Sequence, residues 1–379
     1  MRSHEARVRQ ALYETIRAGN GWIPFDDYLR IVQYAPGLGY YSAGSHKIGP
    51  EGDFITAPEL SPLFGRCMAQ QCAQVLELCG GDVVELGAGS GALAATLLQS
   101  LRDLNRLPEH YLILEVSADL RERQRQRLMR LPGELYERVQ WLDSLPNPPI
   151  HGVFLANEVI DALPFKRFVI AETGAVLERG VALSDDLMLT ESDRAAGDSL
   201  RAEIMRVGGG SVDELPAGYC SELCLMVGPW IAGLAASFAR GAMLLIDYGY
   251  RRRDYYHPQR WQGTLRCHFQ HRAHDDALLY PGLQDISAWV DFTRVAEGAD
   301  AAGLAVAGFC TQTAFLLATG IERELAGQTN ALEHARLASQ ARVLLLPGEM
   351  GEAFKVMALT RGLEEPLCGF VHQDLRGSL

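Results

Sequence analysis

Apolar runs alternate with segments of helical periodicity along most of this chain. The runs are short and rich in Val, Ile and Leu, as in the buried strands of a parallel sheet. They predict strands near 82–86, 111–116, 138–142, 150–156, 242–247, 304–310 and 354–360. After the first of these strands, leucines recur three and four positions apart, which predicts an amphipathic helix. The alternation predicts an α/β fold with a doubly wound parallel sheet.

Several segments lie outside this predicted core. The expected boundaries are 1–60 for an N-terminal helical extension that covers a ligand, 61–165 and 240–361 for the core, 166–239 for an inserted lid of short strands and helices, 314–343 for a helical insertion, and 362–379 for a C-terminal tail. Insertions at the carboxyl ends of strands commonly cover the ligand crevice of such a sheet. The pattern therefore predicts a covered site at that edge.

A glycine-rich turn follows the first predicted strand. Glu85 ends the strand, and Gly87, Gly89 and Gly91 follow it before the helix begins. Glycines at this place let a backbone approach a nucleotide closely, and Gly87, Gly89 and Ala92 also satisfy the dinucleotide pattern of NAD or FAD sites. Glu85 argues against that reading, because an acid there would face a pyrophosphate. The spacing Glu-x-Gly-x-Gly-x-Gly resembles motif I of class I S-adenosylmethionine (SAM) methyltransferases, and SAM carries positive charges and no phosphate, so an acid suits it better.

Acidic residues end the next two predicted strands. Glu115 ends the second strand, where a carboxylate can accept hydrogen bonds from both ribose hydroxyls, although it also stands beside a helix N-cap at Ser117. Asp143 follows the third strand and is a candidate for the adenine end, although Asp-Ser pairs are also ordinary turns. Upstream of the turn, Thr56 lies in a proline-stiffened segment that could fold back over the cofactor.

A second set of polar residues follows the apolar fourth strand at its carboxyl end. Asn157, Glu158 and Asp161 follow this strand, so we expect them beside the methyl donor as catalytic residues. Helix capping explains one such residue more easily than three. If the methyl acceptor is a guanidinium, paired carboxylates would orient its fork, because arginine stays protonated. Asp247, at the end of the fifth strand, and His271, in a later loop, are candidates for substrate binding.

Composition narrows the range of functions. The formal net charge of −12 argues against a nucleic-acid groove as the main surface. Eight cysteines without any C-x-x-C spacing indicate neither a zinc ribbon nor a disulfide framework. Cys267, His268, His271 and His274 invite a metal interpretation, but their spacing completes no convincing tetrahedral set, so no metal is expected. Neither a signal peptide nor a membrane span is recognisable, and we expect a bacterial cytoplasmic protein.

Eight segments carry a resemblance to the MidA-like family. In chain order they are Gly39-Tyr40-Tyr41, GDFITAPELSPLFG at 52–65, ELGAGSG at 85–91, ANEVIDALP at 156–164, IDYGY at 246–250, GTLR at 263–266, PGLQDIS at 281–287 and MGEAFKV at 350–356. This resemblance implies a class I SAM methyltransferase with a seven-stranded, Rossmann-like sheet and added elements. Mitochondrial members are complex I assembly factors that dimethylate an arginine of a core hydrophilic subunit. It therefore implies a protein arginine N-methyltransferase, with a respiratory complex I subunit as a candidate acceptor.

Some positions depart from the family pattern, and some alternatives stay open. Ala88 and Ser90 replace a more common proline and arginine in the turn, Ala57 replaces a serine, and Cys267-His268-Phe269 replaces an aromatic-centred run. The last change leaves the residues that contact the substrate undetermined.

A small-molecule methyltransferase and a SAM-binding assembly factor without turnover are the two alternative functions. A homodimer is compatible with the sequence, but no sequence feature indicates one.

Overall fold

The central feature of the computed structural model is a sheet that contains all seven predicted strands. The structure describes residues 2–42, 55–207 and 215–379, and part of the GDFITAPELSPLFG segment lies outside them. The strands are β2 (Asp82–Leu86), β3 (Tyr111–Leu114), β4 (Val139–Leu142), β5 (Ile150–Asn157), β10 (Phe238–Tyr250), β15 (Ala305–Thr311) and β16 (Phe354–Arg361). Their order is β15-β16-β10-β5-β2-β3-β4, with the short β14 (Val290–Asp291) beside β10.

The sheet is parallel except at one strand. β16 runs antiparallel to both β10 and β15, and the other pairs along the path are parallel. The predicted α/β class and seven-stranded sheet are therefore confirmed, with β16 as the one reversed strand. Because parallel strands end at the same edge, the segments that follow β2, β3 and β5 meet there.

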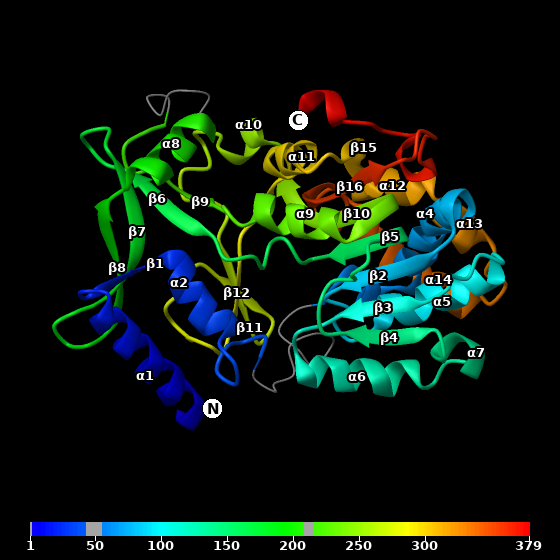
Figure 1. The fold of residues 1–379 in the computed structure, drawn as a ribbon, viewed down its shortest axis with the longest axis horizontal. Helices are drawn as coiled ribbons and strands as arrows, with labels where there is room; N and C mark the ends of the chain where they lie inside the picture. The colour runs from blue at the N-terminus through cyan, green and yellow to red at the C-terminus, as the bar shows by residue number, and fades with distance from the viewer. Residues whose placement is uncertain (1, 43–54, 208–214) are drawn as a thin grey trace.

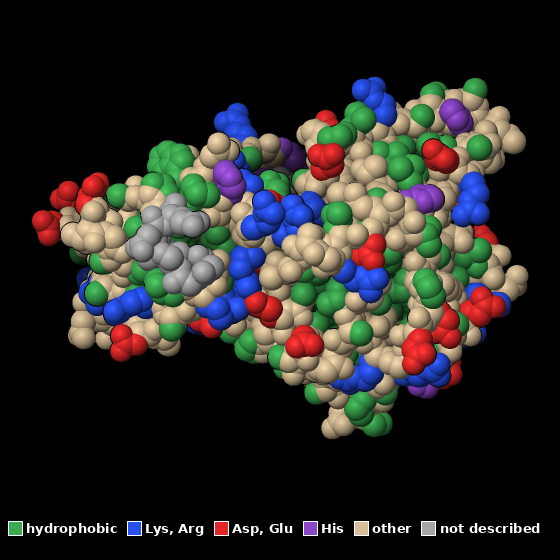
Figure 2. All heavy atoms as spheres, turned by 90° about the horizontal axis from the view of Figure 1, so that it is seen from above, with side chains coloured by type: hydrophobic (Ala, Val, Ile, Leu, Met, Phe, Trp, Pro, Cys, Tyr) green, Lys and Arg blue, Asp and Glu red, His purple; other side chains and the backbone are tan. Residues whose placement is uncertain are grey.

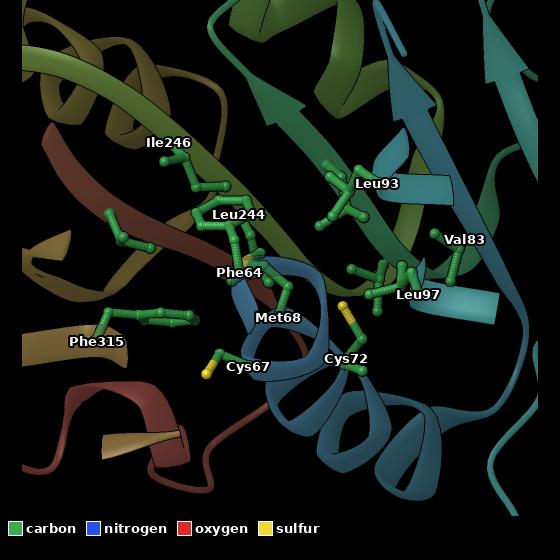
Figure 3. Packing of buried hydrophobic residues seen from close by; sticks show 14 of the residues in the cluster. Phe64, Cys67, Met68, Cys72, Val83, Leu93, Leu97, Leu244, Ile246 and Phe315 are labelled. Carbon is green, nitrogen blue, oxygen red and sulfur yellow. The ribbon is translucent and has the colours of Figure 1, made fainter. Parts of the chain in front are cut away.

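Successive side chains of these strands pack into two separate cores. Val83, Val153 and Leu244 contribute to one core, whereas their chain neighbours Val84, Phe154 and Leu245 contribute to the other. Helices α4 (Pro62–Cys79) and α5 (Ala92–Asp103) cover the first face, and Figure 3 shows α4 side chains against the sheet. Helices α9 (Val227–Ala236) and α11 (Phe292–Ala301) cover the second. Burial of both faces explains why the strands are continuously apolar in sequence.

The N-terminal extension and the insertion build a second sheet together. β1 (Trp22–Pro24) pairs with β7 (Val176–Leu183), in the order β1-β7-β6-β9, with β8 (Leu189–Ala195) beyond β7. β6 is Lys166–Ile170 and β9 is Cys220–Leu223. This sheet lies at the left of Figure 1 with the helices α1 (Arg2–Ala18), α2 (Phe25–Leu29) and α8 (Asp198–Val207). Helix α9, which lies inside the predicted lid range 166–239, packs on α11 and the main sheet.

Smaller elements complete the edge of the sheet where the site lies. A third sheet contains β11 (Arg266–Phe269), β12 (Arg272–His274) and β13 (Asp285–Ser287). The remaining helices are η1 (Arg30–Tyr34), α3 (Ala57–Leu60), α6 (Ala118–Leu128), α7 (Gly133–Tyr136), α10 (Arg252–Tyr255), α12 (Gln312–Ala318), α13 (Ile321–Ala326), α14 (Ala331–Leu345), α15 (Met350–Ala353), η2 (Cys368–Phe370) and η3 (Arg376–Ser378). Within the described part of the chain, no helix is both long and apolar enough to cross a bilayer.

Candidate functional site

A cavity of about 410 Å³ opens at the carboxyl ends of β2, β3 and β5. This first cavity falls within the range of about 300–1,000 Å³ that is usual for small-molecule sites. Seven residues of the predicted cofactor and catalytic sets line it. They are Thr56, Glu85, Gly87, Gly89, Glu115, Asn157 and Glu158.

The glycine turn forms the floor of this cavity with left-handed backbone geometry. Gly87 has φ +63° and Gly89 has φ +53°, a conformation that costs an L-residue with a side chain about 1–2 kcal/mol. Gly91, at φ +82°, is the N-cap of α5 and does not line the cavity. A Cβ at Gly91 would stand 3.4 Å from the Gln124 Cα, so this glycine lets α5 and α6 approach each other.

Two buried carboxylates stand on either side of the turn. Glu85 Oε2 accepts a 2.8 Å hydrogen bond from the Tyr111 hydroxyl, and burial raises its pKa to about 7. Glu115 Oε1 accepts from the Ser117 N–H at 2.9 Å, and burial also raises its pKa. Gln124 donates to both Glu115 Oε2 and the Gly89 carbonyl, which fixes the acid against the turn. A cationic or hydroxyl-bearing ligand would compensate for the loss of water around these acids.

The N-terminal extension covers the cavity through α3. Glu59 of α3 accepts a hydrogen bond from the Ser90 hydroxyl in the glycine turn and forms a 3.0 Å ion pair with Arg127 of α6. Thr56 and Pro58 line the same wall. These contacts tie the extension to two elements of the core, so residues before the core help to enclose the ligand.

A second cavity of about 340 Å³ adjoins the first at Glu158 and Tyr41, which line both. Asp161 and Asp285 bring further carboxylates to it, and Tyr248, Trp289 and Phe354 supply aromatic surface. Tyr248 donates to Asp161, and Tyr41 donates to Asp285 Oδ1 at 2.6 Å. This second cavity therefore combines negative charge with aromatic walls, which is a suitable lining for a planar cation.

The turn after β5 holds its acids in an unusual geometry. Glu158 has φ +55°, a conformation that is uncommon outside glycine and often marks functional sites. The Asn157 side chain donates to Glu158 Oε1 at 3.1 Å, while the Asn157 Oδ1 atom is buried without a hydrogen-bond partner among the described residues. Burial, reinforced by the Asp161 charge, raises the pKa of Glu158 to about 8. Burial and the Asp285 charge raise the pKa of Asp161 to about 7.

Asp247 supports the backbone of this turn and lines neither cavity. Its Oδ2 atom accepts hydrogen bonds from the backbone N–H groups of Ile160 and Asp161 at 3.0 and 3.1 Å. The side chain is fully buried. This position does not support the predicted substrate contact of Asp247, because its carboxylate holds the backbone of the Glu158–Asp161 turn.

Two other predicted residues lie away from both cavities. Asp143 is 91% exposed, and its carboxylate pairs with Arg121 at 2.7 Å, so its position does not support an adenine contact. His271 occupies the tip of the β11–β12 hairpin at φ +60°, beside Gln270 at φ +48°. This two-residue turn needs left-handed residues, which explains the position of His271 without substrate contact.

The alternative metal group does not assemble in the structure. Cys267 is buried, His268 lies 3.8 Å from Asp285, and His271 is at the hairpin tip, so the four side chains do not converge. Among described residues, Asp82, Glu109 and His110 do come close enough to share a metal ion. Asp82 begins β2, at the opposite end of that strand from the first cavity.

Sequence reasoning missed several residues that shape the site. Tyr34 and Tyr41 line the first cavity from the N-terminal extension, and their rings stack with centroids 5.5 Å apart. Asp285 and Trp289 come from a segment well over a hundred residues beyond the glycine turn. Tyr41 and Asp285 belong to the Gly39-Tyr40-Tyr41 and PGLQDIS segments, so the resemblance was the signal that could have found them.

Comparison with known proteins now identifies the fold and its chemistry. The model of a family described as S-adenosyl-L-methionine-dependent methyltransferases matches residues 67–310. The chain belongs to this MidA-like methyltransferase family. Its cofactor is therefore SAM, in agreement with the sequence prediction.

Individual relatives cover nearly the whole chain. A Burkholderia thailandensis protein, crystallised with S-adenosyl-homocysteine, is 39% identical, has a TM-score of 0.95, and covers 100% of this chain and 97% of its own. The zebrafish (Danio rerio) mitochondrial protein arginine methyltransferase NDUFAF7 is 28% identical over 89% of this chain and 83% of its own length. Its Drosophila melanogaster homologue is 30% identical over 92% and 85%.

The first cavity suits this cofactor. The left-handed glycines leave its floor without side chains, and Glu85 and Glu115 supply acceptors for groups that carry charge or hydroxyls. The unpartnered Asn157 Oδ1 atom offers a further acceptor. We assign Glu85, Gly87, Gly89, Glu115 and Thr56 to the residues that would hold SAM.

Proposed function

We propose that this chain is a SAM-dependent protein arginine N-methyltransferase. The observation that carries the proposal is the junction at Glu158, where the cofactor cavity meets a second cavity with three carboxylates and aromatic walls. The arginine methyltransferase names of the relatives support the same acceptor. A respiratory complex I subunit is the first acceptor to test, and a bacterial cytoplasmic setting suits eight cysteines that are all free thiols.

For methyl transfer, the main task of the protein is to position the two reactants. SAM supplies an electrophilic methyl group on a sulfonium. Glu158 and Asp161 would accept hydrogen bonds from the guanidinium fork and so aim one nitrogen toward the cofactor cavity. The aromatic side chains Tyr248 and Trp289 would pack against the faces of the fork and exclude water.

A proton must also leave as the new N–C bond forms, because the methylated guanidinium keeps only one positive charge. Glu158 and Asp161, with pKa values near 8 and 7, can hold that proton at neutral pH. Ordinary exposed carboxylates would be far weaker acceptors. The buried cluster thus serves both orientation and proton uptake.

The direct test uses purified protein, radiolabelled SAM and lysate from cells that lack this protein. We expect label in one or a few protein bands, with mono- or dimethylarginine after acid hydrolysis. Label in the small-molecule fraction alone would favour a metabolite methyltransferase. SAM binding without any transfer would favour the assembly-factor alternative.

The raised pKa values predict a pH dependence of acceptor binding. Below its pKa each carboxyl group is neutral and cannot pair with a guanidinium, so the KM for the acceptor should fall as the pH rises through about 7 and 8. The KM for SAM should change much less over the same range. Initial rates between about pH 6 and pH 9 check this, and an acceptor KM that rises with pH would contradict it.

A further inference from the structure

A third cavity of about 420 Å³ adjoins the second one, and Trp289 and Ala353 line both. Trp289 is the wall between them, since its ring packs edge-on against Tyr248 of the second cavity and stacks on Tyr250 of the third at 4.6 Å. On β16, Phe354 lines the second cavity and the next residue, Lys355, lines the third. A polypeptide whose arginine enters the second cavity would therefore pass the third with a neighbouring residue.

Lys355 gives the third cavity its chemical character. Its ammonium donates to the backbone carbonyls of Glu352 and Ala353, which engage two of its three N–H groups. Within the part of the chain that the structure describes, no carboxylate forms an ion pair with it, and its ammonium lies 5.7 Å from the centroid of the Tyr250 ring. Burial lowers its pKa to about 8, the Arg251 charge acts in the same direction, and the Glu352 and Asp254 charges oppose the shift.

The other charged groups of this cavity are already paired or exposed. Arg251 pairs with Asp254 at 2.6 Å, and Glu352 is an exposed residue on the rim. Arg260 stacks on the outer part of the aromatic wall, with its guanidinium carbon 4.1 Å from the Tyr250 ring centroid. Among the described residues, Lys355 is therefore a cation of this cavity without a carboxylate in direct ion-pair contact, while the Glu352 and Asp254 charges act on it from farther away.

Positively charged side chains also lie on the surface near the third cavity. Helix α10, which carries Arg252 and Arg253, lies along the upper edge of Figure 1. Figure 2 shows that edge from above, where Lys and Arg side chains gather near the middle of the face. Arg252 pairs with Asp291 and Glu297, whereas Arg253 is 82% exposed and could attract an acidic segment toward the third cavity.

We propose that the third cavity binds an acidic side chain of the substrate protein, close in sequence to the methylated arginine, through the Lys355 ammonium. The second cavity would then select the arginine by its carboxylates, and the third would select its flanking residue by the opposite charge. This specificity determinant rests on the proposed arginine acceptor. It gives the enzyme a means to distinguish one arginine from many others.

The test uses short acetylated and amidated Gly/Ser peptides that contain one arginine. A single Asp is moved through each of the three positions before and after the arginine, and each Asp peptide has an Asn counterpart. Affinity for the protein loaded with S-adenosyl-homocysteine is measured by calorimetry. We expect at least one Asp position to bind about tenfold more tightly than its Asn counterpart, which corresponds to one charge-assisted hydrogen bond.

Substitutions then assign the preference to this lysine. Lys355→Met should abolish the Asp preference and leave affinity for the Asn peptides unchanged, whereas Lys355→Arg should retain most of it. Arg253→Met is the matched control, because Arg253 is 82% exposed, lies outside the cavity and carries the same charge. Thermal unfolding of each variant checks that the fold is retained.

The outcomes separate this proposal from the arginine acceptor. Equal affinity of Asp and Asn peptides at every position, or an unchanged preference in Lys355→Met, would overturn the role of Lys355. Replacement of the peptide arginine by citrulline tests the second cavity instead. If citrulline peptides bind as tightly as arginine peptides while the Asp preference persists, the acceptor assignment fails and the role of Lys355 stands.

Discussion

Glu158→Gln is expected to reduce kcat/KM for the acceptor by about 10²–10³-fold and to leave SAM affinity within a few-fold. The amide keeps the volume of the side chain, but it pairs poorly with a guanidinium and cannot take up the released proton. Truncation of one partner of a buried, hydrogen-bonded charge pair costs about 2–5 kcal/mol in binding, and a 10²–10³-fold effect corresponds to about 2.7–4.1 kcal/mol. Initial rates and a calorimetric titration with SAM measure the two quantities separately.

The same variant should not be less stable at alkaline pH. The folded-state pKa of Glu158 is raised to about 8 from an ordinary value near 4.5, so the wild-type protein loses stability as the pH rises between these values. A glutamine does not ionise and avoids that loss. Melting temperatures at about pH 8.5 should therefore be equal or higher in the variant.

Asp143→Asn is the matched control for the predicted loss of activity in Glu158→Gln. It removes one carboxylate from the same edge of the sheet, but its side chain is exposed and paired with Arg121 outside both cavities. We expect unchanged rates and SAM affinity. Equal damage in Asp143→Asn and Glu158→Gln, or joint loss of SAM binding and activity in Glu158→Gln, would contradict the assignment of Glu158 to the acceptor.

Glu115→Ala is expected to weaken SAM binding by about 10–100-fold. The carboxylate lines the cofactor cavity at the end of β3, and hydrogen bonds to a charged group contribute about 1.5–3 kcal/mol each. The two protein donors, the Ser117 N–H and the Gln124 amide, would also lose their acceptor. Calorimetry with SAM and with S-adenosyl-homocysteine should show similar losses, because both share the same nucleoside.

An exposed acid on a neighbouring helix serves as the control here. Glu134 lies on α7, outside the cavities, so Glu134→Ala should leave the affinities for SAM and S-adenosyl-homocysteine unchanged. The alternative role for Glu115 is to support the start of α6 alone. In that case, Glu115→Ala would lower the melting temperature of the ligand-free protein while SAM affinity stayed within two-fold, which would overturn the cofactor role.

The sequence by itself determined the sheet and half of the site, because both depend on local patterns. Continuously apolar strands followed by Glu85, Glu115 and Asn157 require only that parallel strands end at one edge, so the residues after each strand come together. The glycine turn is equally local, since its left-handed backbone depends on the residues themselves.

Only the tertiary structure decided which polar residues face the ligand and which support the fold. Asp247 lies near the end of β10 and Asp161 follows β5, yet Asp247 accepts hydrogen bonds from backbone N–H groups whereas Asp161 lines the second cavity. Tyr41, Asp285 and Trp289 reach the site from distant segments, and the N-terminal extension closes it through Glu59. These contacts join residues far apart in the chain, and a periodic pattern carries information only about neighbours within an element.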